Sequence, residues 1–173
     1  MKPTQLNGTY YIEEDRVMLR IKSNDQAEYR FWLTRVMMQK ILTAIEKISI
    51  KNIAHTNPSK TLSQGVVEVI DEMQQKAIET ETDLTVPYQP AHKLPLGADP
   101  QLIKEVTFIT IGSFQVNMQF VLKNQTPIDL ELNMATLAKI RLLLNELNKK
   151  AQWDLSGEHE IVQDPIVPTH AIH

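Results

Sequence analysis

Hydrophobic residues occupy every second position in two neighbouring stretches of the chain, at 17, 19 and 21 and again at 29, 31 and 33. A spacing of two is typical of a β-strand with one buried face. The alternating residues Glu28, Arg30 and Trp32 are therefore expected on the outer face. The polar run 23–26 favours a turn, and a further strand is indicated over 8–13. Together these patterns predict a three-stranded antiparallel sheet.

After the second stretch the hydrophobic spacing changes to three and four residues, which predicts a helix over about 35–48 that begins after the capping residue Thr34. The same succession returns later in the chain. Strands are predicted over 107–111, 116–122 and 128–132, and a helix over 134–152 after the capping residue Asn133. The sequence therefore predicts an α+β fold built from two tandem β-β-β-α repeats that are related by pseudo-two-fold symmetry.

One three-stranded sheet and one helix would bury little apolar surface, so the two repeats are expected to share a core. They would form either one continuous six-stranded sheet or two facing layers. Pairing within one chain is favoured because both copies lie on the same polypeptide. Pairing between two chains is the alternative that the sequence leaves open.

The predicted organisation has four parts. Residues 1–50 form the first repeat, 51–104 a linker, 105–153 the second repeat and 154–173 a flexible C-terminal tail, with both repeats in one domain. In the linker an acidic amphipathic helix is expected over about 64–80, capped by Ser63. Its apolar face would be buried and consist of Val66, Ile70, Met73 and Ala77. Four prolines within 87–100 favour an extended crossover.

Composition narrows the function only a little. The chain has 173 residues, no cysteine and a formal net charge of −3. Without cysteine, disulfides and thiol chemistry are excluded. The negative charge argues against binding nucleic acid by bulk attraction, although eight Lys and Arg stand against six Asp and Glu in the first fifty residues. With no secretory signal or long apolar run recognisable, the chain is predicted to be cytoplasmic and not to bind a membrane.

The outer sheet face of the first repeat is the candidate binding surface. Its members are Met18, Arg20, Lys22, Arg30, Trp32 and, at the start of the helix, Arg35. Met37 is expected to enlarge the exposed apolar part beside Trp32. A mixed apolar and basic surface is typical of protein contacts. The leading hypothesis is therefore a non-enzymatic interaction module that binds a protein partner or forms a homo-oligomer.

The alternative is single-stranded nucleic-acid binding, because such ligands need cations for phosphates and flat rings for base stacking. The element order, strands followed by a helix and then repeated, resembles that of the Whirly-type single-strand binders. Each unit has three strands here and four in those proteins. The resemblance implies that the sheet face would bind the nucleic acid.

Catalytic chemistry has little support in the sequence. No nucleophile elbow, phosphate-binding loop or zinc-binding motif occurs, so no catalytic residue and no cofactor is predicted. The histidines His159, His170 and His173 lie in the predicted tail. His170 and His173 have an i, i+3 spacing, but no helix is predicted there and no second shell supports them, so no metal site is predicted either. A substrate pocket between the repeats, covered by 85–105, is the catalytic alternative that stays open.

Overall fold

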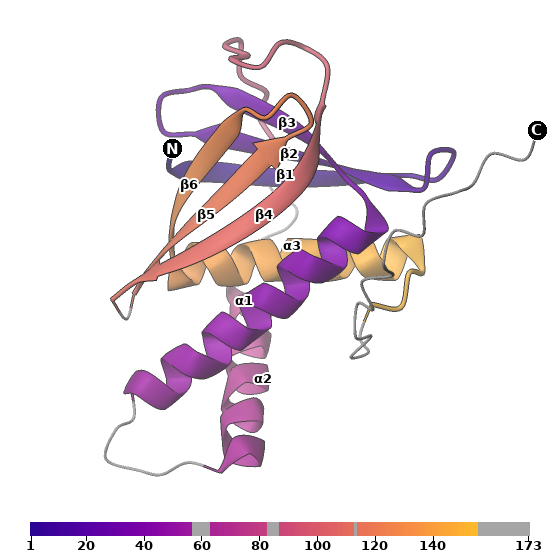
Figure 1. Ribbon diagram of the computed structural model, residues 1–173. Coiled ribbons are helices and arrows are strands. Elements are labelled where there is room, and N and C mark those ends of the chain that lie inside the picture. Colours follow the sequence, from indigo (N-terminus) through magenta and orange to yellow (C-terminus); the bar gives the residue numbers. More distant parts are fainter. Residues whose placement is uncertain (57–62, 83–86, 113, 156–173) are drawn as a thin grey trace, which may run out of the picture.

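The computed structural model describes residues 1–56, 63–82, 87–112 and 114–155, and within these ranges six strands and three helices follow one another (Figure 1). The strands are β1 (Pro3–Tyr11), β2 (Arg16–Ser23), β3 (Glu28–Leu33), β4 (Gln101–Ile111), β5 (Gln115–Leu122) and β6 (Pro127–Asn133), and the helices are α1 (Arg35–Thr56), α2 (Gln64–Glu81) and α3 (Met134–Ala151). The fold is α+β.

All six strands belong to one mixed sheet in the order β1-β2-β3-β4-β5-β6. Neighbouring strands are antiparallel except β3 and β4, which are parallel. Of the two predicted arrangements, the continuous sheet is the one observed. Figure 1 shows β4–β6 running across the direction of β1–β3. The sheet is strongly curled, since the N–H of Glu131 in β6 donates to the carbonyl of Met1 at 2.8 Å.

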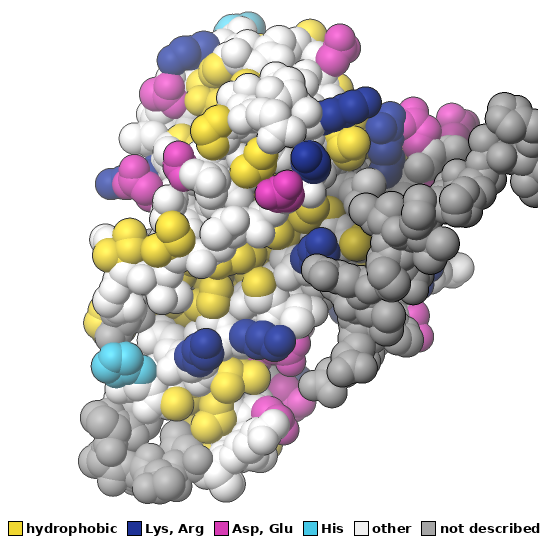
Figure 2. Space-filling model, in the orientation of Figure 1, with side chains coloured by type: hydrophobic (Ala, Val, Ile, Leu, Met, Phe, Trp, Pro, Cys, Tyr) yellow, Lys and Arg dark blue, Asp and Glu magenta, His cyan; other side chains and the backbone are white. Residues whose placement is uncertain are grey.

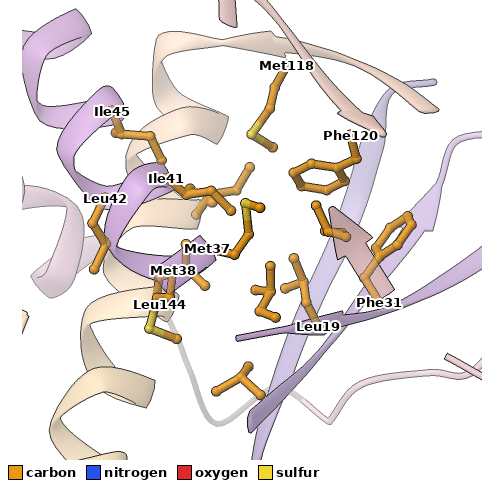
Figure 3. Packing of buried hydrophobic residues seen from close by; sticks show 14 of the residues in the cluster. Leu19, Phe31, Met37, Met38, Ile41, Leu42, Ile45, Met118, Phe120 and Leu144 are labelled. Carbon is orange, nitrogen blue, oxygen red and sulfur yellow. The ribbon is translucent and has the colours of Figure 1, made fainter. Parts of the chain in front are cut away.

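The core lies between one face of this sheet and the helices α1 and α3 (Figure 3). The predicted alternation of β2 is confirmed, because Val17, Leu19 and Ile21 are at most 1% exposed. The two halves meet where the rings of Phe31 and Phe120 pack edge to face with centroids 5.2 Å apart. Strands β3 and β5 thus pack together across the two halves of the chain.

Two of the helices begin with the side-chain cap that the sequence predicts. The hydroxyl of Thr34 accepts a hydrogen bond from the N–H of Met37 at 3.3 Å, and the side chain of Asn133 accepts one from Thr136 at 2.7 Å. The prediction for Ser63 is wrong, because its side chain makes no capping hydrogen bond to α2. Met37 is buried and not exposed, since α1 packs against β4, α2 and α3 and so buries more than one apolar stripe.

The ends of the helices and strands differ from the prediction more than their types do. β1 covers Pro3–Tyr11 and not 8–13, and β4 begins at Gln101, well before the predicted 107. The extension of β1 comes from its pairing with β2, and that of β4 from its pairing with β3 and β5. Pro3 lies opposite Ser23, and Gln101 lies opposite Phe31. A local periodicity does not report such partners.

The buried face predicted for α2 is wrong. Val66 and Met73 are exposed, whereas Val67 and Asp71 are buried where α2 contacts α1 and α3. The Asp71 carboxylate accepts a hydrogen bond from the Arg141 guanidinium of α3 at 2.6 Å. A buried carboxylate is tolerated when it is paired in this way. The ion pair orients α2, and the apolar stripe of the helix faces away from the core.

Gly8 of β1 lies directly against Leu147 of α3. A Cβ atom at this position would overlap the Cδ1 atom of Leu147, which is 2% exposed and has little room to move. Gly8→Ala is therefore expected to destabilise the protein by about 1–3 kcal/mol in urea unfolding. Gly65→Ala is the control, because no atom lies within 4 Å of a Cβ there. That change should be neutral or slightly stabilising, and equal losses for both variants would contradict the packing described here.

Candidate interaction surface

The structure brings together five of the six residues predicted for the binding surface. In the β2–β3 pairing, Met18 lies opposite Trp32 and Arg20 lies opposite Arg30, so these side chains share the outer face with Lys22. All five are partly exposed. Arg35 lies apart from them at the first residue of α1 and is exposed. The predicted surface therefore exists, and its two ends have different surroundings.

At one end, Trp32 is held by two residues that the sequence analysis missed. The Arg16 guanidinium lies over the indole ring, 3.9 Å from its centroid, and Tyr11 packs edge-on with centroids 5.1 Å apart. Arg16 in turn forms an ion pair with Glu14. One face of the Trp32 ring is therefore occupied by a cation from the same molecule.

At the other end, the crossover 87–100 lies against the outer face. Glu28, which was expected on the outer face, is only 1% exposed. Its carboxylate accepts hydrogen bonds from Arg30 at 2.7 Å and from the N–H of Ala91 at 3.1 Å, and its own N–H donates to the carbonyl of Lys93 at 2.9 Å. Glu28 is buried because the proline-rich segment covers it, which is a tertiary effect that strand alternation does not show.

The same segment engages both arginines of this end. Arg30 donates a second hydrogen bond to the carbonyl of Ala98 at 3.0 Å, and the Arg20 guanidinium lies 5.3 Å from the ring centroid of Tyr88. The hydroxyl oxygen of Tyr88 is buried. Burial, together with the negative charge of Glu28, raises the pKa of Tyr88. The basic end is thus largely turned toward groups of its own chain.

Arg35 has a structural contact with the end of α3. Its guanidinium donates to the carbonyl of Trp153 at 2.6 Å, and the indole N–H of Trp153 donates to Asp15 at 2.6 Å. Tyr10 also donates to Asp15, at 2.9 Å. The hydrogen bonds from Trp153 and Tyr10 lower the pKa of the Asp15 carboxyl. These contacts fasten the β1–β2 turn, the start of α1 and the end of α3 together.

These contacts bear on the nucleic-acid alternative, which stays a prediction. Phosphate binding needs guanidinium groups with free donors, and base stacking needs an open ring. Arg30 and Arg35 donate to protein acceptors, and Arg16 occupies a face of Trp32. Arg30, Arg35 and one face of the Trp32 ring are thus already engaged within the chain.

Two cavities lie between α2 and α3, of about 590 and 240 Å³. Gln75, Glu79 and Asn145 line both of them. The catalytic alternative placed a pocket beneath 85–105, so these cavities lie elsewhere. In the described part of the chain no three His, Asp or Glu side chains are grouped as metal ligands. The histidines His159, His170 and His173 and the tail from residue 156 onward lie outside the described residues.

The feature that the sequence analysis missed is the free edge of β4. β3 pairs with β4 only through Phe31 with Gln101 and Trp32 with Leu102, because the chain leaves the sheet after Leu33 to form α1. β4 nevertheless continues to Ile111, paired with β5 on its other side. Within the described residues, 104–111 have no strand partner on the β3 side. We call this stretch the β4 edge.

The β4 edge is neutral and apolar over most of its length. Val106 and Phe108 are half-buried toward the core, whereas Ile109 and Ile111 are 55% and 56% exposed. Phe114, in the turn that follows, is 66% exposed. Figure 2 shows hydrophobic side chains gathered along β4 and between β4 and α1. Charged residues occur only at the beginning of the edge, at Lys104 and Glu105.

Comparisons with known proteins add no family to this picture. No protein-family model, no curated protein and no solved structure matches the chain. Among the residues that the structure describes, no helix has both the length and the apolar character needed to cross a membrane. The candidate surface and the β4 edge are therefore the features from which a function can be inferred.

The contacts between the crossover and β3 predict a response to acid. Hydrogen bonds from Ser23 and Lys93 lower the pKa of Asp25 to about 2. Burial would raise the pKa of Glu28, but the hydrogen bonds from Arg30 and the Ala91 N–H outweigh it, and the pKa is lowered. A carboxyl with a lowered folded-state pKa stabilises the fold above its unfolded pKa, and this contribution is lost as pH falls through the folded value.

We therefore expect the crossover to loosen as pH falls from about 4.5 toward 2. Amide exchange at Ala91 and Glu28, whose N–H groups donate across this contact, is followed by NMR and measures the loosening. Glu28→Gln should weaken the protection of these amides already at pH 7 and flatten its pH dependence. Glu13→Gln, at an exposed turn position, is the control and should leave the profile unchanged. Identical profiles for both variants would show that Glu28 does not hold the crossover.

Proposed function

We propose that this protein is a non-enzymatic interaction module that binds an extended protein segment by adding it as a strand to the β4 edge. The observation that carries the proposal is the unpaired run 104–111 on a strand that is otherwise well paired with β5. Its free N–H and C=O groups are a template for another strand. Recognition of extended peptides by strand addition works in this way.

The composition of the β4 edge supports this use. Proteins commonly protect sheet edges with lysine, proline, a bulge or a covering segment. Between Val106 and Ile111 there is no charged residue and no proline, and the register irregularity of β4 lies before this run, between Ile103 and Glu105. Helix α1 contacts β4 but leaves Ile109 and Ile111 more than half exposed, so this apolar part of the edge is open to pairing with another strand.

Part of the predicted binding surface adjoins this edge. Trp32 lies opposite Leu102 in the β3–β4 pairing, and Met18 lies opposite Trp32. In the proposed complex, side chains of an added strand that point to the outer face would approach these residues. Met18 and Trp32 would then flank the added strand, whereas Arg20, Arg30 and Arg35 contact other parts of their own chain.

We also propose that the halves are two copies of one β-β-β-α unit. Support comes from the element order, in which three strands precede α1 and three precede α3. It also comes from the pattern of burial. Leu19 and Met118 hold corresponding positions in the two units, and each is at most 1% exposed. In this view β4 corresponds to β1. The β4 edge then arises where the first unit ends, because α1 and not another strand follows β3.

Selection of short random peptides displayed on phage tests the proposed function. Peptides selected on the wild-type protein should be rich in β-branched residues and should bind through the β4 edge. Ile109→Lys places a charge on the edge and should abolish their binding. Val69→Lys is the matched control, because Val69 on α2 is 52% exposed and Ile109 is 55% exposed. It should bind the peptides as the wild type does.

Two outcomes would contradict the proposal. One is that selected peptides bind Ile109→Lys as well as they bind the wild type. The other is that no peptide is enriched although the protein is folded, as judged by its circular dichroism. Either result would remove the β4 edge as a strand-accepting site.

A further inference from the structure

We infer that the strand accepted by the β4 edge is the β4 edge of a second copy, paired antiparallel about a two-fold axis. This inference rests on the proposed function and names its partner. A two-fold axis perpendicular to the sheet places the same edge of both copies against each other and joins their sheets into one. Such an interface is closed, because each copy has used its free edge once it has paired.

The length of the free edge determines the register. After the irregularity that ends at Glu105, the run 105–111 is continuous with β5 on its other side. An antiparallel pair that uses all of this run has Phe108 at its centre, opposite Phe108 of the second copy. Glu105 then lies opposite Ile111, and Thr107 opposite Ile109.

The faces and charges of this register are complementary. Residues opposite one another in an antiparallel pair point to the same face. Thr107 and Ile109 share the outer face, and Val106 and Thr110 share the core face, as their pairing with β5 shows. The central pair joins two aromatic rings, which is a favourable cross-strand contact. Each Glu105 lies beside a neutral residue, so no like charges oppose each other.

Neutrality favours a second copy over a charged partner. An edge that carries no charge from Val106 to Ile111 offers nothing to attract a basic or acidic peptide, and its own sequence provides a strand of matching apolar and β-branched character. The exposed Ile109 and Ile111 of one copy would be covered by the outer-face side chains of the other.

Cross-linking can test this register directly, because the chain contains no cysteine. Glu105→Cys and Ile111→Cys are made in separate chains and mixed under oxidising conditions. In the inferred register these residues lie directly opposite one another, with Cα atoms about 4.5–5.5 Å apart, within disulfide range. The two copies of residue 105 are about 20 Å apart along the strands, as are the two copies of residue 111.

The mixture should therefore give a covalent dimer, whereas each variant alone should stay uncross-linked. Light scattering of the unmodified chain should show a dimer at high concentration, and Ile109→Lys should remain a monomer. Met73→Cys reports on the exposed apolar stripe of α2 as a rival contact. Cross-linking through residue 73, or through 105 or 111 alone, would overturn the inferred interface.

The two proposals can fail separately. If the unmodified chain is a monomer at every concentration and the mixture does not cross-link, the second copy is not the partner. The proposed function would still stand if peptides bind the wild type and Val69→Lys but not Ile109→Lys. If Ile109→Lys also leaves peptide binding unchanged, both proposals are wrong.

Discussion

Replacing Phe120 with alanine is expected to destabilise the protein by about 3–5 kcal/mol, the range for large apolar residues in a closed core. Phe120 is 0% exposed and packs edge to face on Phe31, with centroids 5.2 Å apart. The contact joins β3 of the first half to β5 of the second, so the cavity would lie where the two halves meet. Urea unfolding followed by circular dichroism measures the loss.

Phe114→Ala is the matched control for this prediction. Phe114 is 66% exposed, and its removal should change the free energy of unfolding by about 0.5 kcal/mol or less. Similar losses for the two variants would mean that Phe120 is not enclosed as described. A separate early unfolding of β4–β6 in the Phe120→Ala variant would also contradict a core shared by both halves.

The ion pair between α2 and α3 carries the second large effect. Asp71 is 5% exposed, and its partner Arg141 has a side chain that is 14% exposed. Removing one partner of a buried pair leaves the other charge uncompensated and typically costs about 3–5 kcal/mol. Asp71→Ala should therefore lower stability by up to this amount. The α2 amides should lose protection first, because Asp71 is one of the two residues of α2 that are buried.

Two comparisons separate the ion pair from general damage to α2. Glu46 lies 4.0 Å from Arg141 and its side chain is 54% exposed, so Glu46→Ala should cost no more than about 1 kcal/mol. The double variant Asp71→Leu with Arg141→Met removes both charges and should be markedly more stable than Asp71→Ala. A double variant as unstable as Asp71→Ala would show that packing, and not the unpaired charge, explains the loss.

The sequence predicts the element types well because each depends on local periodicity. Val17, Leu19 and Ile21 are buried as the alternation requires, and Thr34 and Asn133 cap their helices. The α+β class follows from these elements, whereas the sequence left one continuous sheet and two facing layers as alternatives. In these places local preference and tertiary packing agree.

The errors arise where distant segments decide burial. Glu28 is buried because the crossover supplies the N–H of Ala91, and Asp71 is buried because α3 supplies Arg141. No pattern within β3 or α2 contains this information. The buried face of α2 was predicted wrongly for the same reason. Val66 and Met73 do have a helical spacing, but they lie on the exposed side of the helix.

For the candidate surface, too, the local pattern was predicted correctly and the tertiary contacts were missed. The sequence placed Arg20, Arg30 and Trp32 on one outer face, and the register of β2 and β3 does bring them together. It did not reveal that Tyr88 and Ala98 of the crossover meet the arginines. The β4 edge was missed because an unpaired edge depends on where the neighbouring strand ends. The end of β3 at Leu33 and the length of β4 become visible only in the assembled sheet.

Amide hydrogen exchange along β4, measured by NMR as a function of protein concentration, tests the proposed pairing most directly. Alternate N–H groups of an antiparallel strand point to opposite edges, so within 105–111 one set faces β5 and the other faces away. The outward set should exchange rapidly in dilute protein and gain protection as concentration rises, with Ile109→Lys abolishing the gain. Rapid exchange at every concentration, or full protection already in the dilute monomer, would contradict a free edge that pairs with a second copy.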